Sequence, residues 1–217
     1  MQVKICGITQ AGQAQAIAHL GATALGFICV PASPRYVTMH QIGAIAAGLQ
    51  ADTETRHVER IGVFVDASAD HIRQVVTQGH LSGIQLHGSE PPEMAQALKQ
   101  AMPHIKVIKA FRVRSPESLS AVERYDHHVD ALLLDAFAPQ AHGGTGQTLD
   151  WTTLGSFQPE SPWFLAGGLT PANIAQALHH LHPDGIDLSS GVEQAPGQKD
   201  LRKVTQLFRN LAAIRAL

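Results

Sequence analysis

The chain has 217 residues, a length that suits one domain with a large apolar core. Hydrophobic residues make up 44% and charged residues 16%, a composition that excludes an intrinsically disordered chain. A formal net charge of −2 with scattered basic residues argues against a nucleic-acid-binding surface, and no apolar run is long enough for a membrane-spanning helix.

Eight short apolar runs, many rich in β-branched residues, predict β-strands. Most of these runs lack alternating polar residues, which is typical of strands covered on both faces in a parallel sheet. In chain order they are Val3–Cys6, Ala24–Val30, Arg60–Val65, Gly83–Leu86, Ile105–Ala110, Ala131–Leu134, Trp163–Ala166 and Gly185–Leu188.

Segments with helical periodicity separate these runs, and the last of them carries an apolar stripe at Leu201, Val204, Phe208 and Leu211. The segment Asp150–Gly155 is the weakest expected helix. Hydroxyl side chains can cap a helix, and proline suits its first position. These signals predict helix starts at Ser68, Ser89, Ser115-Pro116 and Thr170-Pro171.

Eight strands, each followed by a helix, predict an α/β fold of the (β/α)8 TIM barrel type, with residues 1–217 as a single domain. An open doubly wound sheet shows the same alternation but usually has five or six strands, so the count favours a closed barrel. The glycine-rich polar segment Ala136–Thr148 is interpreted as a functional loop and not as a domain boundary.

Cysteine and histidine usage bears on redox setting and metal binding. With Cys6 and Cys29 alone, a disulfide framework is not expected, and no signal-peptide pattern follows Met1, so we expect a cytoplasmic protein. Thirteen histidines invite a metal interpretation, but His127-His128 and the cluster His179–His182 lack the ligand company of known sites. We therefore expect no metal and no cofactor.

Glycine-rich loops follow the last three predicted strands. Phosphate binds where backbone N–H groups converge, and the loops after strands 7 and 8 of TIM barrels frequently provide that arrangement. Any one such loop could instead be a tight turn, but three together favour phosphate. A phosphosugar is therefore expected at Gly144 after strand 6, at Gly167 and Gly168 after strand 7, and at Ser189, Ser190 and Gly191 after strand 8.

Cys6 and Asp135 stand at the ends of strands 1 and 6, at the expected barrel mouth. A thiolate is a competent base, and cationic surroundings can lower the pKa of the thiol. A partly buried carboxylic acid can keep its proton near neutrality. Such a pair suits a sugar isomerisation. Taken singly, Cys6 could be a small buried hydrophobe, and Asp135 could cap a loop or pair with arginine.

Over nearly its whole length the chain resembles the phosphoribosylanthranilate isomerase family. The resemblance rests on motifs that occur in order at the expected barrel loops: Lys4–Thr9, Gly26–Ile28, Ser33–Val37, Gly62–Val65, Gln85–Gly88, Leu133–Asp135, Gly143–Gly146, Asp150-Trp151, Leu165–Leu169, Asn173, Asp187–Glu193 and Pro196–Asp200. Gln147 departs from the family, because many relatives carry lysine after this Gly-Gly-Thr-Gly motif.

The resemblance implies an Amadori rearrangement in tryptophan synthesis. Asp135 would protonate the furanose ring oxygen, and the Cys6 thiolate would remove the C2 proton of the resulting Schiff base. Arg35 would hold the anthranilate carboxylate with its planar fork. Asp187 would assist near the anilinic nitrogen or the hydroxyls. His87, beside Gln85, would shape the mouth or could equally be a satisfied core residue. The enzyme would be a monomer or a homodimer.

Three alternatives compete with this interpretation. One is another phosphate-binding barrel enzyme, such as the tryptophan synthase α subunit, ribulose-phosphate epimerase or thiamine-phosphate synthase. The α subunit would be expected to use a carboxylate pair with no need for Cys6, and the epimerase would need metal-ligating histidine and carboxylate residues at strand ends. An inert phosphosugar-binding barrel would be marked by loss of Cys6 or Asp135. An enzyme that also isomerises the histidine-pathway ribotide would place aspartate at the end of strand 1. Cys6 and Asp135 are present and no such metal-ligand set is evident, so the residues argue against the α subunit, the epimerase, the inert barrel and the enzyme of broader range.

Overall fold

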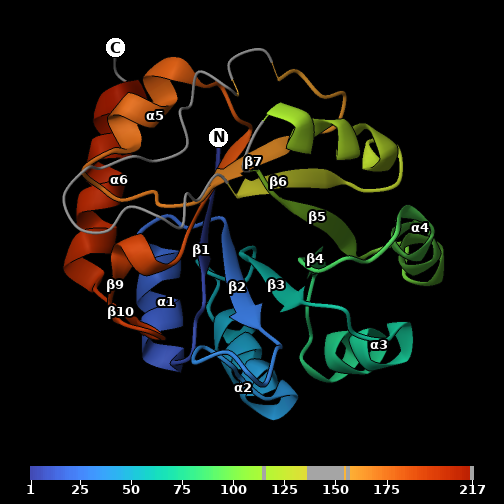
Figure 1. Ribbon diagram of the computed structural model, residues 1–217. Coiled ribbons are helices and arrows are strands. Elements are labelled where there is room, and N and C mark those ends of the chain that lie inside the picture. The colour runs from blue at the N-terminus through green and yellow to red at the C-terminus, as the bar shows by residue number, and fades with distance from the viewer. Residues whose placement is uncertain (114–115, 136–153, 155–156, 216–217) are drawn as a thin grey trace.

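Eight parallel strands close into a barrel in the order in which they follow along the chain (Figure 1). The structure, a computed structural model, describes residues 1–113, 116–135, 154 and 157–215. The closed sheet confirms the predicted TIM barrel. Its strands are β1 (Gln2–Cys6), β2 (Ala24–Ile28), β3 (Glu59–Phe64), β4 (Gly83–Leu86), β5 (Lys106–Arg112), β6 (Ala131–Asp135), β7 (Trp163–Ala166) and β8 (Gly185–Leu188).

Four strands end at residues other than those predicted: β3 and β6 differ by one residue, and β2 and β5 differ by two for identifiable reasons. Strand β2 ends at Ile28, two residues before the predicted end at Val30. The residue after Val30 is Pro31, which has no backbone N–H to donate to a neighbouring strand. Strand β5 runs to Arg112, because Arg112 pairs in register with Asp135 of β6.

Closure depends on the first strand, which pairs with both β2 and β8. Lys4 on β1 stands opposite Asp187 on β8, although they are far apart in the sequence. Side chains alternate between the barrel interior and the helix layer, so residues two apart on one strand share a face. One apolar cluster consists of strand residues, namely Ala24, Ile61, Ile108, Ala110, Ala131, Leu133, Phe164 and Ala166.

Helices surround the barrel, and a larger apolar core joins them to the strands (Figure 1). The α-helices are α1 (Ala11–His19), α2 (Met39–Ala51), α3 (Ala69–Gln78), α4 (Pro92–Ala101), α5 (Ile174–His180) and α6 (Leu201–Arg215). Two 3-10 helices, η1 (Pro116–Ala121) and η2 (Glu123–Tyr125), stand between β5 and β6. After β8 come a 3-10 turn, η4 (Ser190–Val192), and a hairpin of β9 (Glu193–Ala195) and β10 (Gln198–Lys199).

The predicted helix starts have different outcomes. Ser68 caps α3, where its hydroxyl accepts the backbone N–H of His71 at 3.3 Å. The prediction for Ser89 was wrong: α4 begins at Pro92, and the Ser89 hydroxyl donates instead to Asp66.

A turn displaces the helix start predicted at Thr170-Pro171, so that α5 begins at Ile174. Thr170 and Asn173 exchange side-chain-to-backbone hydrogen bonds across this turn, at 2.7 and 3.3 Å. Ser115 lies outside the described residues, as does most of Asp150–Gly155 and the whole predicted functional loop Ala136–Thr148. Among the helices that are described, none has the length and apolar character needed to cross a bilayer.

Candidate active site

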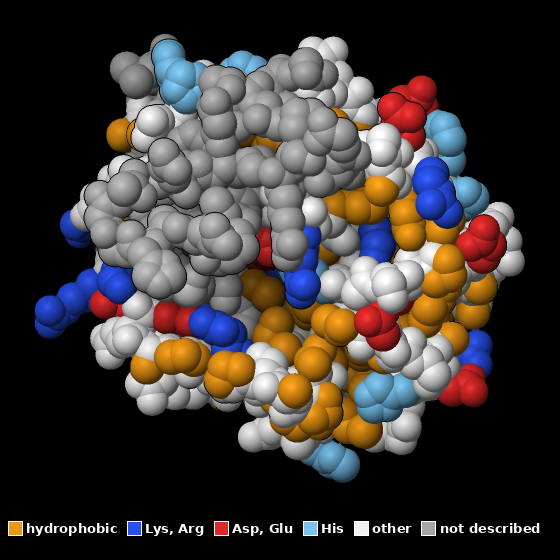
Figure 2. Space-filling view, viewed as in Figure 1, with side chains coloured by type: hydrophobic (Ala, Val, Ile, Leu, Met, Phe, Trp, Pro, Cys, Tyr) orange, Lys and Arg blue, Asp and Glu red, His pale blue; other side chains and the backbone are white. Residues whose placement is uncertain are grey.

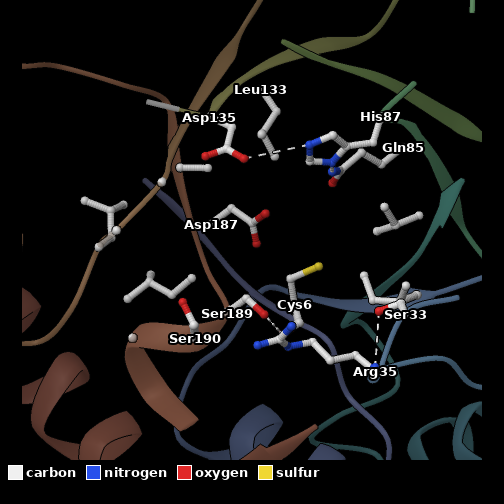
Figure 3. A pocket seen from close by; sticks show the side chains of 18 residues that line it. Cys6, Ser33, Arg35, Gln85, His87, Leu133, Asp135, Asp187, Ser189 and Ser190 are labelled. Carbon is white, nitrogen blue, oxygen red and sulfur yellow. Dashed lines mark hydrogen bonds and ion pairs between the residues drawn. The ribbon is translucent and has the colours of Figure 1, made fainter. Parts of the chain in front are cut away.

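A cavity of about 310 Å³ lies at the carboxyl ends of the barrel strands (Figure 3). Every predicted site residue that the structure describes lines this cavity: Cys6, Arg35, Asp135, Gly167, Gly168, Asp187, Ser189, Ser190 and Gly191. Gly144, the remaining predicted residue, lies outside the described part of the chain. Charged side chains of both signs are intermixed on the face shown in Figure 2, and basic ones border its central hollow.

Cys6 ends β1 with its sulfur over Gly26 of the neighbouring strand β2. A Cβ atom added at Gly26 would stand 2.6 Å from the Cys6 Sγ, so the absence of a side chain there makes room for the sulfur. Burial raises the pKa of the Cys6 thiol, and Asp187 adds to this effect, while Lys4 and Lys199 act in the opposite direction. The net change is upward, which corrects the expectation of a lowered pKa: the thiol is buried more deeply than a strand-end position suggested.

Lys4 and Asp187 form a buried ion pair beside Cys6. The Lys4 Nζ donates to Asp187 Oδ2 at 2.9 Å, and the lysine side chain is fully buried. Burial lowers the pKa of Lys4, but the negative charges of Asp187 and Cys6 outweigh it and raise the pKa. The other carboxylate oxygen, Asp187 Oδ1, is buried without a hydrogen-bond partner among the described residues. A buried acceptor of this kind, on the wall of a cavity, is suited to a ligand donor.

Gln85, His87 and Asp135 form a row across the opposite side of the cavity (Figure 3). Burial is the main cause that lowers the pKa of His87 to about 4, so the imidazole is neutral at pH 7. The Gln85 Nε2 lies 2.8 Å from His87 Nδ1 and can donate to it, which leaves the ring hydrogen on Nε2. That nitrogen lies 3.8 Å from Asp135 Oδ2. His87 therefore faces the cavity and is not a core residue.

Arg35 lies in the loop after β2, and its side chain passes over Gly7 in the loop after β1. A Cβ atom at Gly7 would lie 2.7 Å from the Arg35 Cδ, and Gly7 has a φ of +79° that favours glycine. The guanidinium Nη2 donates to Glu193 Oε2 at 2.6 Å, and Nε donates to Glu193 Oε1 at 3.0 Å. The edge of the fork formed by Nε and Nη2 is thus already occupied in the free protein.

The two glycine-rich loops after β7 and β8 approach each other closely. Gly167 and Gly168 have φ values of +93° and +65°, in the left-handed region that favours glycine. A Cβ atom at Gly191 would stand 1.9 Å from the carbonyl oxygen of Leu169, so only glycine allows this contact between the loops. The Asn173 side chain donates to the Gly168 carbonyl at 2.9 Å and holds the first loop. Glycine backbone therefore forms part of this wall of the cavity, beside the side chains of Ser189 and Ser190.

Three buried charged residues near the cavity had no predicted role: Lys4, Glu193 and Lys199. A signal for Lys4 was present, because a lysine within a strand buried on both faces is unusual unless it is paired. Glu193 and Lys199 flank Pro196-Gly197, a turn signal that predicts a hairpin. The sequence could not show that this hairpin returns to Arg35.

Comparisons with known proteins agree with this geometry. Residues 3–210 match the family model described as N-(5'phosphoribosyl)anthranilate (PRA) isomerase. The N-(5'-phosphoribosyl)anthranilate isomerase of Rippkaea orientalis is 58% identical over 211 residues, which cover 97% of this chain and 96% of that protein.

Solved structures give the same result. The phosphoribosyl anthranilate isomerase of Thermotoga maritima superimposes with a TM-score of 0.87 at 33% identity, covering 98% of this chain and 99% of that one. A structure described as monomers of the dimeric Thermotoga maritima enzyme has a TM-score of 0.83, 30% identity and 98% coverage of both chains. Another, in complex with reduced 1-(o-carboxyphenylamino)-1-deoxyribulose 5-phosphate, has a TM-score of 0.83 at 31% identity, covering 98% and 99%.

Proposed function

The chain belongs to the N-(5'-phosphoribosyl)anthranilate isomerase family, and we propose that it catalyses that Amadori rearrangement with Cys6 as general base and Asp135 as general acid. The reaction converts N-(5'-phosphoribosyl)anthranilate to 1-(2-carboxyphenylamino)-1-deoxyribulose 5-phosphate, a step in tryptophan synthesis. One observation carries the assignment of the two residues: Cys6 and Asp135, from strands β1 and β6, line one cavity together with both glycine-rich loops.

The proposed reaction begins with ring opening. Asp135 donates its proton to the furanose ring oxygen, the bond from C1 to that oxygen breaks, and the nitrogen lone pair forms a C1=N Schiff base. The Cys6 thiolate then takes the proton from C2, the released electron pair forms the C1=C2 bond of an enolamine, and the C1=N π electrons return to the nitrogen. Transfer of the C2 hydroxyl proton to solvent and protonation at C1 complete the ketone.

The buried charges around Cys6 support its role as a base. Because burial raises the pKa of the thiol, the thiolate is the minor form at neutral pH, but it is a strong base once formed. Lys4 and Lys199 favour the thiolate and offset part of the effect of burial. Asp187 Oδ1, which has no hydrogen-bond partner in the described part of the chain, suits a substrate N–H or hydroxyl near the reacting carbons.

We assign the remaining substrate contacts by chemistry. Arg35 binds the anthranilate carboxylate, and the loops carrying Gly167, Gly168 and Ser189–Gly191 bind the phosphate, with Gly144 as a further candidate outside the described residues. Residues 1–217 act as one catalytic domain. Because a similar enzyme is described as dimeric, we propose a monomer or homodimer. A cytoplasmic location and the lack of a nucleic-acid partner remain predictions from composition.

Substitutions at Cys6 and Asp135 test the acid–base assignment. Cys6→Ala and Asp135→Asn should lower kcat by about 10²–10⁴-fold, because each group acts mainly in the transition state. The loss of fluorescence of freshly prepared substrate measures kcat, and titration with the reduced product analogue measures binding, which should change little. Cys29→Ala is the matched control, since Cys29 is the other buried thiol and should be dispensable. Near-full kcat in either variant would remove the role assigned to that residue.

Substrate range follows from Cys6 at the end of β1. An enzyme that also isomerised the histidine-pathway ribotide would be expected to have aspartate at this position, so we expect turnover of the anthranilate ribotide alone. Kinetics with both ribotides measure this, and comparable turnover of the two would contradict it.

A further inference from the structure

In the proposed function Arg35 binds the substrate carboxylate, but the buried carboxylate of Glu193, which lies beside Arg35, has no assigned role. Glu193 opens the β9–β10 hairpin, directly after the proposed phosphate loop. It is 158 residues from Arg35 in the sequence, yet its side chain lies against the guanidinium. The exposed fractions of the two side chains are 4% for Glu193 and 23% for Arg35, so this pair is not a solvated surface contact.

The contacts of Glu193 fix the orientation of the arginine. The Arg35 Nε lies 3.0 and 3.1 Å from the two carboxylate oxygens, and Nη2 lies 2.6 Å from Oε2. A guanidinium has five N–H donors in one plane. Glu193 engages the edge formed by Nε and Nη2, which leaves Nη1 and the second hydrogen of Nη2 for another acceptor. Among the described residues, Nη1 has no hydrogen-bond partner.

Lys199 completes a buried charged cluster around the same carboxylate. Its Nζ donates to Glu193 Oε1 at 2.7 Å and is fully buried, and the Gly197 N–H donates to that oxygen at 3.2 Å. Burial raises the pKa of Glu193, but the hydrogen bonds from Arg35 and Lys199 outweigh this and hold the pKa below its usual value. With Glu193 ionised, two cations face one anion. Burial lowers the pKa of Lys199, and its hydrogen bond to Glu193 opposes this change. With Arg35 and Lys199 both protonated, the cluster carries one excess positive charge, and Arg35 presents it at the cavity wall.

The hairpin that carries Glu193 is itself held by the loop after β1 and by helix α1. The Thr9 hydroxyl donates to the Gly197 carbonyl at 2.5 Å, and the Gln13 side chain exchanges two hydrogen bonds of 3.0 Å with the Lys199 backbone. Arg35, packed on Gly7, is thus restrained from both sides. An arginine that is ordered before binding loses less rotamer freedom when it takes a ligand.

We propose that Glu193 is a positioning residue that holds the Arg35 guanidinium with its Nη1–Nη2 edge toward the substrate's aromatic carboxylate. This proposal rests on the assignment of Arg35 in the proposed function. The Glu193 carboxylate fixes the plane of the guanidinium. Because Arg35 and Glu193 together carry no net charge, the positive charge of Lys199 gives the cluster a net attraction for the substrate carboxylate. The selectivity for an aromatic ring bearing a carboxylate then depends on a residue that does not touch the substrate. Figure 3 shows the guanidinium beside Cys6 and Ser189 on the cavity wall.

Binding of two ligands distinguishes a role of Glu193 in positioning Arg35 from a general structural role of Glu193. One is reduced 1-(o-carboxyphenylamino)-1-deoxyribulose 5-phosphate, and the other is the same compound without its ring carboxyl group. Titration calorimetry with Glu193→Gln should show the first ligand bound about tenfold more weakly, and the second bound less than about threefold more weakly. KM should rise while kcat stays within a few fold. In an Arg35→Met background, Glu193→Gln should have no further effect on either ligand.

Controls keep the test decisive. Glu59→Gln removes a carboxylate paired with Lys106 on other strands and should leave both affinities unchanged. Should Glu193→Gln fold poorly by circular dichroism, Glu193→Asp keeps the charge on a shorter arm and should still weaken the carboxylated ligand selectively.

Three results would overturn the proposal: equal weakening of both ligands, an effect that persists without Arg35, or tighter binding of the carboxylated ligand by Glu193→Gln. A failure of the underlying assignment would look different. In that case the wild type would bind both ligands equally, or Arg35→Met would lose no selectivity.

Discussion

At the scale of single residues, burial decides the chemistry of the site more than residue type does. Cys6 and His87 are both titratable groups on the cavity wall, and burial is the largest cause of each shift in pKa. It raises the pKa of the thiol and lowers the pKa of the imidazole, because each change favours the neutral form. The charged forms of Cys6 and His87 are therefore both disfavoured in the free protein.

His87 should make the stability of the protein depend on pH. Its pKa is near 6.5 in an unfolded chain and about 4 in the folded protein, so the unfolded chain binds more protons between these values. The contribution of His87 to the free energy of unfolding is fully present above pH 6.5 and is lost as the pH falls toward 4. The loss amounts to about 3 kcal/mol. Urea unfolding of the wild type and His87→Asn between pH 4 and 7 measures this. The unfolding free energy of the variant should fall less steeply with falling pH than that of the wild type. Identical dependences of unfolding free energy on pH would contradict the prediction.

Gly26 should be required for the placement of Cys6. In Gly26→Ala, the new Cβ would stand 2.6 Å from Sγ and 3.0 Å from the Cys6 Cα, so the sulfur or the strand must move. We expect a lower kcat and a loss of about 1–3 kcal/mol in unfolding free energy. Gly12→Ala in α1 is the control, since nothing lies within 4 Å of its added Cβ. It should keep full activity and be neutral or stabilising by up to about 1 kcal/mol. Wild-type kcat in Gly26→Ala would show that the sulfur's position is not critical.

At the scale of elements, buried ion pairs tie loops to strands. Lys109 on β5 donates to Glu90 in the loop before α4 at 2.8 Å, and the two side chains are 3% and 1% exposed. Glu90 also accepts the backbone N–H of Asp66 after β3 at 2.9 Å. The pair therefore joins the ends of β3, β4 and β5 on the outside of the barrel, away from the proposed acid and base.

Removal of the lysine should be costly for folding. Lys109→Met leaves the Glu90 carboxylate buried without its cation, and we expect a loss of about 3–5 kcal/mol in unfolding free energy. Lys106→Met on the same strand is the control, because its partner Glu59 is 35% exposed, and it should cost about 1 kcal/mol or less. Denaturant unfolding measures both. Addition of Glu90→Gln to Lys109→Met should recover part of the loss, and equal small costs for the two lysines would contradict this account.

At the scale of the whole molecule, the closed barrel brings the two ends of the chain together. Strand β1 pairs with β8, and helix α6 packs against both α1 and α5 (Figure 1). The inner face of α6 includes Val204, Leu207 and Leu211, all nearly or fully buried. The last helix therefore covers the junction between the first and last strands, and the barrel should unfold as one unit.

A substitution on α6 tests this cooperativity. Leu207→Ala removes a fully buried side chain and should lower the unfolding free energy by about 2–5 kcal/mol. Far-UV circular dichroism and binding of the reduced product analogue should be lost at the same urea concentration. Leu201→Ala on the same helix, where the side chain is 37% exposed, should have a small effect. Separate transitions for the two signals would show that α6 is not coupled to the cavity.

The sequence by itself determined the eight strands, the closed barrel and the strand-end positions of the candidate site residues. These features follow from local patterns, because apolar runs, glycines and strand ends are visible within a few residues, and chain topology places all strand ends at one mouth.

Only the tertiary structure decided which charges meet and how deeply they are buried. Glu193 reaches Arg35 across 158 residues, Lys4 pairs with Asp187 across the closure of the barrel, and Ser89 bonds to Asp66 instead of capping α4. The upward shift in the pKa of Cys6 depends on burial and on charges from three separate segments. Electrostatic energies depend on distance and desolvation, and neither can be derived from a local sequence pattern.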